Sequence, residues 1–259
     1  MHVFTDDAQA LSRWIRDEVE LERETAKGSR GKAVRRVQEW LNLHGIGMVV
    51  DEDFGPVTER CLKRFQQRTG LPTTGRANQA TFAALVQPMI EVLKKRPSGG
   101  DMASAMSAYA EAHLAAHPRE IGGQNRGPWV RLYMQGHEGV AFPWCAGFVT
   151  FLLEQASQTL ERRMPIEGSF SCDSLAAQAK AAGRFLRESE ASAGRLPPGA
   201  LFLVRRTNTD WTHTGMVTEA LDGIFDTIEG NTNDEGSREG FEVCARSRSY
   251  KSKDFILVE

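Results

Sequence analysis

The sequence predicts an α+β protein, in which a small three-helix N-terminal module precedes a larger α+β domain with an antiparallel sheet. Two patterns lead to this prediction. Apolar residues at helical spacing dominate the N-terminal part, and short strand-like runs between Gly and Pro turns dominate the C-terminal part. The 259 residues, 41% apolar and 25% charged, suffice for one large or two modest domains of an ordinary globular protein.

The N-terminal part divides into a lead-in and a compact module. Residues 1–28 place apolar side chains between charged ones, which favours a helical lead-in, with a partly ordered segment as the alternative. Residues 29–90 contain three helical patterns joined by Gly/Pro loops, which is typical of a three-helix module. Residues 91–103 have the composition of a linker, so residues 104–259 are expected to form the second domain.

Several short strings in this module are distinctive. They are residues 53–58 (Asp-Phe-Gly-Pro-Val-Thr), the Phe65-Gln66 pair and residues 81–85 (Thr-Phe-Ala-Ala-Leu). Together they resemble the common peptidoglycan-binding domain of bacterial wall hydrolases, over roughly residues 29–88. The resemblance implies bacterial peptidoglycan as a partner. Most of the matching positions are scaffold, so no ligand contact is assigned to an individual residue.

The second domain begins with helices and ends with strands. A helix is expected over residues 102–117, ended by Pro118. Five β-prone runs follow later in the chain, at residues 200–204, 214–220, 224–229, 241–244 and 255–258. Helices followed by strands favour an α+β domain with a mostly antiparallel sheet.

Cys145 stands at the expected start of a helix, in the string Phe-Pro-Trp-Cys-Ala-Gly-Phe (residues 142–148). A thiol at a helix N-terminus is close to the positive end of the helix dipole, which favours the nucleophilic thiolate. His213 follows downstream, and then Glu229 and Asn231. Cysteine, histidine and orienting polar groups are the components of a papain-type nucleophilic site.

The expected hairpin between the second and third strands gives this hypothesis a geometric condition. Leu-Asp-Gly at residues 221–223 is typical of a three-residue loop, a type I turn followed by glycine in the left-handed conformation. With that loop, His213 faces Asn231, and Glu229 lies on the same side of the sheet. A two-residue turn would move both partners to the other face, so the catalytic interpretation requires the three-residue loop.

The same residues carry a second resemblance. Cys145 with its helix, His213 followed by Thr-Gly-Met-Val, and the string from Glu229 to Asn231 resemble the CHAP family of papain-like cysteine amidohydrolases and peptidases, which cut peptidoglycan. The resemblance covers about residues 105–259. It implies Cys145 as nucleophile, His213 as base, and Glu229 and Asn231 as orienting groups for the imidazole. The Asp-rich calcium loop of some members is not evident before Cys145, so we expect no metal and no cofactor.

Four further residues are candidates for substrate binding. Trp144 and Trp211 flank the nucleophile and the base in sequence and are candidates to line a groove, with packing in the core as the alternative. The oxyanion is expected at the backbone N–H of Cys145 and one further donor. Gln124 or Asn125 is the candidate for that donor, with turn contacts inside their loop as the alternative.

The other three cysteines are scattered and lack the clustered spacing of a zinc site. Cys61 falls in a helical pattern and Cys244 in a strand, where a small buried side chain is expected. Cys172 follows Ser-Phe-Ser and is a candidate for exposure.

Composition and charge narrow the partners and the location. A formal charge of −2 gives no overall attraction for nucleic acid, and no window has the length of a membrane span. The first residues lack the basic and apolar regions of a secretory signal. The expectation is therefore a protein made in the cytoplasm that reaches the wall after release or delivery, as a phage endolysin or a delivered effector does. A delivery system or an immunity protein is a further partner that such a route would involve.

Two function classes follow from the sequence. The favoured one is a peptidoglycan hydrolase, either an N-acetylmuramoyl-L-alanine amidase or an endopeptidase. The alternative is a non-catalytic wall-binding or phage structural protein that keeps an inactive hydrolase fold. Reactivity of the Cys145 thiol would distinguish them.

Overall fold

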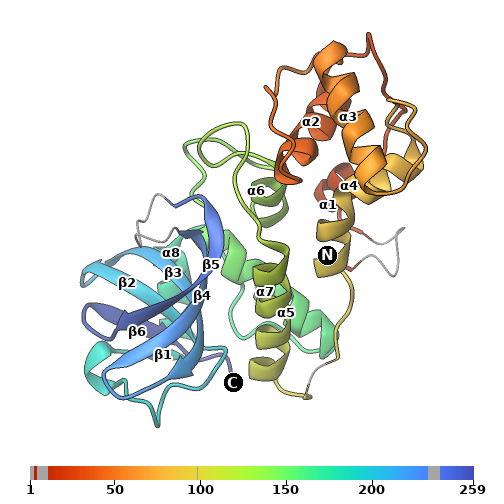
Figure 1. The fold of residues 1–259 in the computed structure, drawn as a ribbon. Coiled ribbons are helices and arrows are strands. Elements are labelled where there is room, and N and C mark those ends of the chain that lie inside the picture. Colours follow the sequence, from red (N-terminus) through yellow and green to blue (C-terminus); the bar gives the residue numbers. More distant parts are fainter. Residues whose placement is uncertain (1–2, 5–10, 98, 233–239) are drawn as a thin grey trace.

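The computed structural model describes residues 3–4, 11–97, 99–232 and 240–259, and it confirms the α+β class (Figure 1). Over these residues the α-helices are α1 (Arg13–Val19), α2 (Lys32–Leu43), α3 (Pro56–Arg68), α4 (Gln79–Val92), α5 (Met102–Ala116), α6 (Pro128–Tyr133), α7 (Cys145–Thr159) and α8 (Cys172–Ala181). The strands are β1 (Phe185–Leu186), β2 (Leu201–Thr207), β3 (Asp210–Ala220), β4 (Ile224–Thr232), β5 (Glu242–Ser249) and β6 (Lys253–Ile256), with a short 3-10 helix, η1 (Glu188–Glu190), after β1.

The three predicted helices of the N-terminal module are α2, α3 and α4. Gly55 and Pro56 begin α3, since proline fits the first helical position, where its missing N–H has no partner to lose. The loop before α3 is held by the buried Gln38 of α2, whose Nε2 donates to Asp51 Oδ1 at 2.7 Å and to Thr58 Oγ1 at 3.1 Å. These hydrogen bonds satisfy a buried amide and fix the loop against the helices.

The lead-in contains one short helix. Only α1 is helical in the described part of residues 1–28, and it is seven residues long. Ile15 and Val19 are buried in the core, so α1 packs into the molecule, where it contacts α4 and α6.

A single six-stranded sheet organises the second half, in the order β1-β6-β2-β3-β4-β5 with every neighbouring pair antiparallel. The five predicted strands are present, and the two-residue β1 was not predicted. Helices α5 and α7 pack together, and α7 lies against β3 and β4 (Figure 1). α8 also packs on β3, so the first turns of two helices meet the strand that carries His213.

The hairpin between β3 and β4 corrects one expectation. Leu221 N donates to Ile224 O at 2.9 Å, which closes the two-residue turn Asp222-Gly223 and not the predicted three-residue loop. The pairing Ala220↔Phe225 then changes to Met216↔Ile228 across an irregularity between Val217 and Glu219. This bulge shifts the register by one residue, which restores the alignment that the three-residue loop would have produced.

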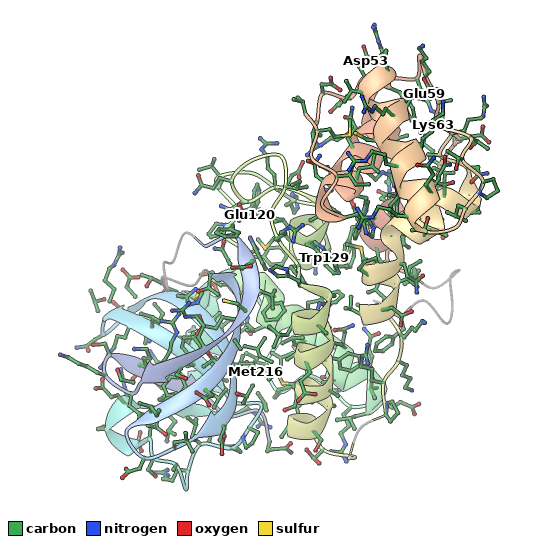
Figure 2. The ribbon with its side chains drawn as sticks, viewed as in Figure 1. Asp53, Glu59, Lys63, Glu120, Trp129 and Met216 are labelled. Carbon is green, nitrogen blue, oxygen red and sulfur yellow. The ribbon has the colours of Figure 1, made fainter. Side chains whose placement is uncertain are left out.

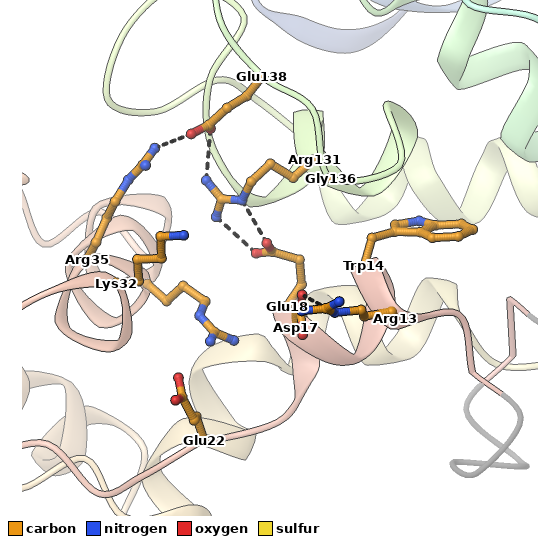
Figure 3. Close-up of a pocket in the computed structure, with 11 residues that line it drawn as sticks. Arg13, Trp14, Asp17, Glu18, Glu22, Lys32, Arg35, Arg131, Gly136 and Glu138 are labelled. Atoms are coloured by element: carbon orange, nitrogen blue, oxygen red, sulfur yellow. Dashed lines mark hydrogen bonds and ion pairs between the residues drawn. The ribbon is translucent and has the colours of Figure 1, made fainter.

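A buried ion cluster joins the N-terminal module to the second half. Arg131 of α6 binds Glu18 of α1 (Nε to Oε1, 2.7 Å), Glu39 of α2 (Nη2 to Oε2, 2.7 Å) and Glu138 (Nη1 to Oε2, 2.9 Å). Arg35 of α2 adds a 2.6 Å bond to Glu138 (Figure 3). The cluster forms part of the lining of a pocket of about 490 Å³ between α1, α2 and the segment after α6. Trp129, also on α6, lies at this junction (Figure 2).

No helix among the described residues combines the length and the apolar character needed to cross a bilayer.

We expect Arg131→Met to lower the free energy of unfolding by about 3–5 kcal/mol, because Glu18 and Glu39 would stay buried without their cation. Urea denaturation at pH 7 measures the loss. Arg126→Met is the matched control: Arg126 is half-exposed and 3.9 Å from Glu138, so its loss should cost less than about 1 kcal/mol. Equal losses in the two variants would contradict a structural role for the cluster.

Candidate active site

Cys145 is the first residue of α7, as predicted, and its side chain is 5% exposed. Small residues allow the neighbouring elements to approach this first turn. A Cβ added to Gly147 would lie 2.7 Å from Tyr133 O, and one added to Gly230 would lie 2.8 Å from Phe148 Cβ. Both distances are far below a van der Waals contact, so glycine is required for α6 and β4 to pack against the start of α7.

His213 and Glu229 lie side by side on adjacent strands. His213 Nε2 is 2.8 Å from Glu229 Oε2, and both side chains are buried. Gly215 leaves the space for this contact, because an added Cβ would lie 2.7 Å from Glu229 Cγ. With Nε2 on the carboxylate, the buried Nδ1 is the ring nitrogen left to interact with Cys145, and this interaction helps to raise the pKa of His213.

Glu229 is held by two further side chains. Arg248 of β5 donates to both carboxylate oxygens, from Nε to Oε1 and from Nη2 to Oε2, each at 2.5 Å. Thr227 Oγ1 donates to Oε1 at 2.7 Å. A buried carboxylate with this set of donors has a fixed position and stays ionised.

The three groups shift one another's protonation. The pKa of Cys145 lies well below its usual value, because hydrogen bonds from Cys172, His213 and the Thr214 backbone N–H outweigh the effect of burial. Burial opposes the charged form of His213, but its bonds with Cys145 and Glu229 raise its pKa to about 9. Burial likewise opposes ionisation of Glu229, yet Arg248 and His213 lower its pKa to about 2. The favoured state is a thiolate, an imidazolium and a carboxylate in a row.

Asn231 is placed differently from Glu229. It is buried in β4 with a left-handed φ of 55°, next to an irregularity in the β4–β5 pairing. His213 Nε2 donates its hydrogen bond to Glu229 Oε2, so Glu229 is the residue positioned to orient the imidazole.

The two tryptophans do not line an open groove, which corrects the candidate role given to them. Trp144 is fully buried and stacks on Tyr133, with ring centroids 5.4 Å apart. Trp211 is 5% exposed, and its Nε1 donates to the buried Asp254 at 3.0 Å. Both side chains therefore stabilise the core on either side of the site.

The polar loop before α6 is held by hydrogen bonds of its own residues. Asn125 is buried, and its Nδ2 donates to Val140 O at 3.3 Å, while Gln124 is exposed. Glu120 is the centre of this loop: its carboxylate accepts from Asn125 N at 2.8 Å and from Trp144 Nε1 at 2.9 Å (Figure 2). The backbone N–H of Asn125 thus makes a contact inside the loop, and its side-chain amide bonds the segment before α7.

Three residues beside the site were missed by sequence reasoning. Glu120 and Arg248 occur in strings with no distinctive pattern, and the partners that connect them to the site, Trp144 and Glu229, are 24 and 19 positions away in the chain. Cys172 is 7% exposed, which corrects its expected exposure, and it interacts with Cys145. In the described part of the chain, no group of three or more His, Cys, Asp or Glu side chains is arranged to hold a metal ion.

Comparison with known proteins identifies the N-terminal part. Residues 30–85 match the family model for peptidoglycan binding domains, so the chain carries a peptidoglycan-binding domain at its N-terminal end. A zinc D-Ala-D-Ala carboxypeptidase from Streptomyces albus G is 37% identical over 65 residues, which span 24% of this chain and 26% of that protein. The chain therefore spans about a quarter of that relative's length.

Two solved structures are also similar over part of the chain. One is the SleB N-terminal domain, 33% identical over 25% of this chain and 90% of that one, with a TM-score of 0.25. The other is a fused Zn-dependent amidase/peptidase/peptidoglycan-binding domain-containing protein from Clostridium acetobutylicum ATCC 824, 22% identical over 36% of this chain and 44% of that one, also with a TM-score of 0.25. The family-model match ends before α7, so the site around Cys145 rests on its own geometry.

We expect Cys145 to react with iodoacetamide at acidic pH. An ordinary thiol is only about 0.3% thiolate at pH 6. The lowered pKa of Cys145 should make it react at least about 10-fold faster, after allowing for the weaker nucleophilicity of a stable thiolate. The rate of alkylation, followed by mass spectrometry from pH 5 to pH 9, measures this. Cys145→Ala is the control, and it should lose the fast reaction at acidic pH.

We expect Arg248→Met to lower the free energy of unfolding at pH 7 by about 2 kcal/mol, the value of a charged hydrogen bond. Because the folded-state pKa of Glu229 lies below its unfolded value, this contribution is present above about pH 4.5 and is lost as the pH falls toward 2. The difference between variant and wild type should therefore shrink over that range in urea titrations. Arg206→Met, at an exposed arginine of β2, is the control; a difference independent of pH would contradict the assignment.

Proposed function

We propose that the protein is a peptidoglycan hydrolase that cleaves an amide bond of the wall peptide, with Cys145 as the nucleophile. The observation that carries this proposal is the row of Cys145, His213 and Glu229 at the first turn of a helix. A thiolate next to an imidazolium that is held by a carboxylate is the arrangement that activates a cysteine toward carbonyl groups.

The mechanism follows from the protonation of these groups. His213 takes the thiol proton at Nδ1, and the thiolate attacks the amide carbonyl carbon. The imidazolium then protonates the leaving amine. Water activated by His213 hydrolyses the resulting thioester, which releases the acid product and restores Cys145. Glu229 keeps the ring oriented and stabilises its charge through both proton transfers.

The oxyanion has donors at the start of α7. The first N–H groups of a helix have no partner within the helix, and those of Cys145 and its successors lie beside the nucleophile. We assign the developing charge to these groups, with no role for the side chains of Gln124 and Asn125.

The peptidoglycan-binding domain supports the choice of substrate. It supplies a wall-binding module in the same chain as the site, and the matched Streptomyces protein bears the name of a D-Ala-D-Ala carboxypeptidase. We propose peptidoglycan as the substrate of this chain as well. We do not propose zinc chemistry for it, because the match covers about a quarter of that protein. An amidase and an endopeptidase both fit the site.

We expect wild-type protein to release soluble fragments from purified sacculi, and Cys145→Ala to bind the sacculi with at least about 1000-fold slower release. Mass spectrometry of the new ends identifies the bond. Free lactyl groups on muramic acid indicate an amidase, and new amino termini within the peptide indicate an endopeptidase.

Cys244→Ala is the matched control for this experiment, because Cys244 lies on β5 and its pKa is raised by burial. Its rate should equal that of the wild type. Release that continues in Cys145→Ala would overturn the assignment of the nucleophile. Binding without release by the wild type, across sacculi of several chemotypes, would favour the non-catalytic alternative.

A further inference from the structure

A second thiol lies directly against the nucleophile. Cys172 is the first residue of α8, as Cys145 is of α7, and both helices pack on β3. The two thiols are hydrogen-bonded to each other, and neither is in a disulfide. Their side chains are 5% and 7% exposed, so the pair lies just below the surface.

The two sulfur atoms have different protonation. The Cys172 S–H donates to Cys145, which stabilises the Cys145 thiolate and raises the pKa of Cys172 well above its usual value. Cys145 is therefore the sulfur that reacts first with an electrophile, and Cys172 retains its proton. A cysteine that only filled space would not need its thiol to face another thiol.

We propose that Cys145 and Cys172 form a peroxide-sensitive modification site, in which Cys172 traps oxidised Cys145 as a reversible disulfide. The proposal rests on the assignment of Cys145 as the nucleophile. The reagent class is a hydroperoxide, with hydrogen peroxide as the simplest member.

The chemistry balances in two steps. The Cys145 thiolate attacks the peroxide, so that a sulfur–oxygen bond forms, the O–O bond breaks, and hydroxide or alkoxide leaves; Cys145 becomes a sulfenic acid. The Cys172 sulfur then attacks the sulfenic sulfur, the S–O bond breaks, and the thiol proton leaves with the hydroxyl as water. One peroxide is reduced and two thiols are oxidised to one disulfide.

The geometry favours the second step over further oxidation. The two thiols interact where the first residues of α7 and α8 meet at β3, and a disulfide requires the sulfur atoms to approach to about 2.05 Å. Closure removes the nucleophile but keeps it at an oxidation state that a thiol reductant reverses, whereas sulfinic acid is irreversible without a dedicated enzyme. The pair would protect the site during exposure to peroxide.

The test is to treat wild type, Cys172→Ser and Cys172→Ala with hydrogen peroxide, alkylate the free thiols, and map the peptides without reduction. In the wild type we expect a linked pair of peptides that joins Cys145 to Cys172, with the loss of two hydrogen atoms. In both Cys172 variants we expect Cys145 to gain two or three oxygen atoms. After dithiothreitol, hydrolysis of sacculi should recover in the wild type and remain below about a tenth of its starting rate in the variants.

Cys244→Ser controls for non-specific oxidation and should behave as the wild type. Sulfinic acid forming at Cys145 at equal rates with and without Cys172 would overturn the proposal, as would a linkage to Cys61 or Cys244. The linked peptide of the wild type is informative even if a Cys172 variant folds poorly. Because peptide mapping needs no peptidoglycan, a linked pair in a protein that cleaves no sacculi would reject the hydrolase function and not the thiol pairing.

Discussion

The site depends on the hydrogen bond between His213 and Glu229. A buried carboxylate would take up a proton if it had no charged partners. Here Arg248 donates to both carboxylate oxygens and Thr227 donates to Oε1, so the carboxylate that accepts from His213 at Oε2 is ionised and held in place. That contact fixes the ring at Nε2 and turns Nδ1 toward Cys145. Activation of the thiol thus depends on Arg248 of β5, which lies two strands away from β3.

His213 and Glu229 share one face of the sheet although the β3–β4 turn has two residues and not the predicted three. A two-residue turn alone would have put Glu229 on the other face of the sheet. The bulge in β3 between Val217 and Glu219 adds one residue and returns the strand to the required register. No glycine marks this bulge in the sequence, so the pattern of residues gave no reason to place it there.

The sequence was most informative where structure is local. The helix start at Cys145 and the three helices of the N-terminal module follow from spacing and from Gly and Pro positions, and all are present. It was least informative for contacts between distant segments. The burial of Trp144 depends on Tyr133 and Glu120, and the role of Arg248 depends on a carboxylate 19 residues earlier. Such partners meet only when the sheet and helices pack, and one sequence carries no signal for that.

The short helix α6 packs against both halves of the molecule and so fixes their relative position, which a flexible linker would not do. Arg131 of this helix binds carboxylates from α1 and α2. The end of the same helix packs against the first turn of α7, where Gly147 lies so close to Tyr133 O that no side chain would fit between them. Arg131, which anchors the peptidoglycan-binding domain, is therefore only two positions from Tyr133, which packs against the first turn of the nucleophile's helix. The position of Cys145 relative to that domain is set by packing, and a wall strand held by the domain would meet the site at a fixed distance and orientation.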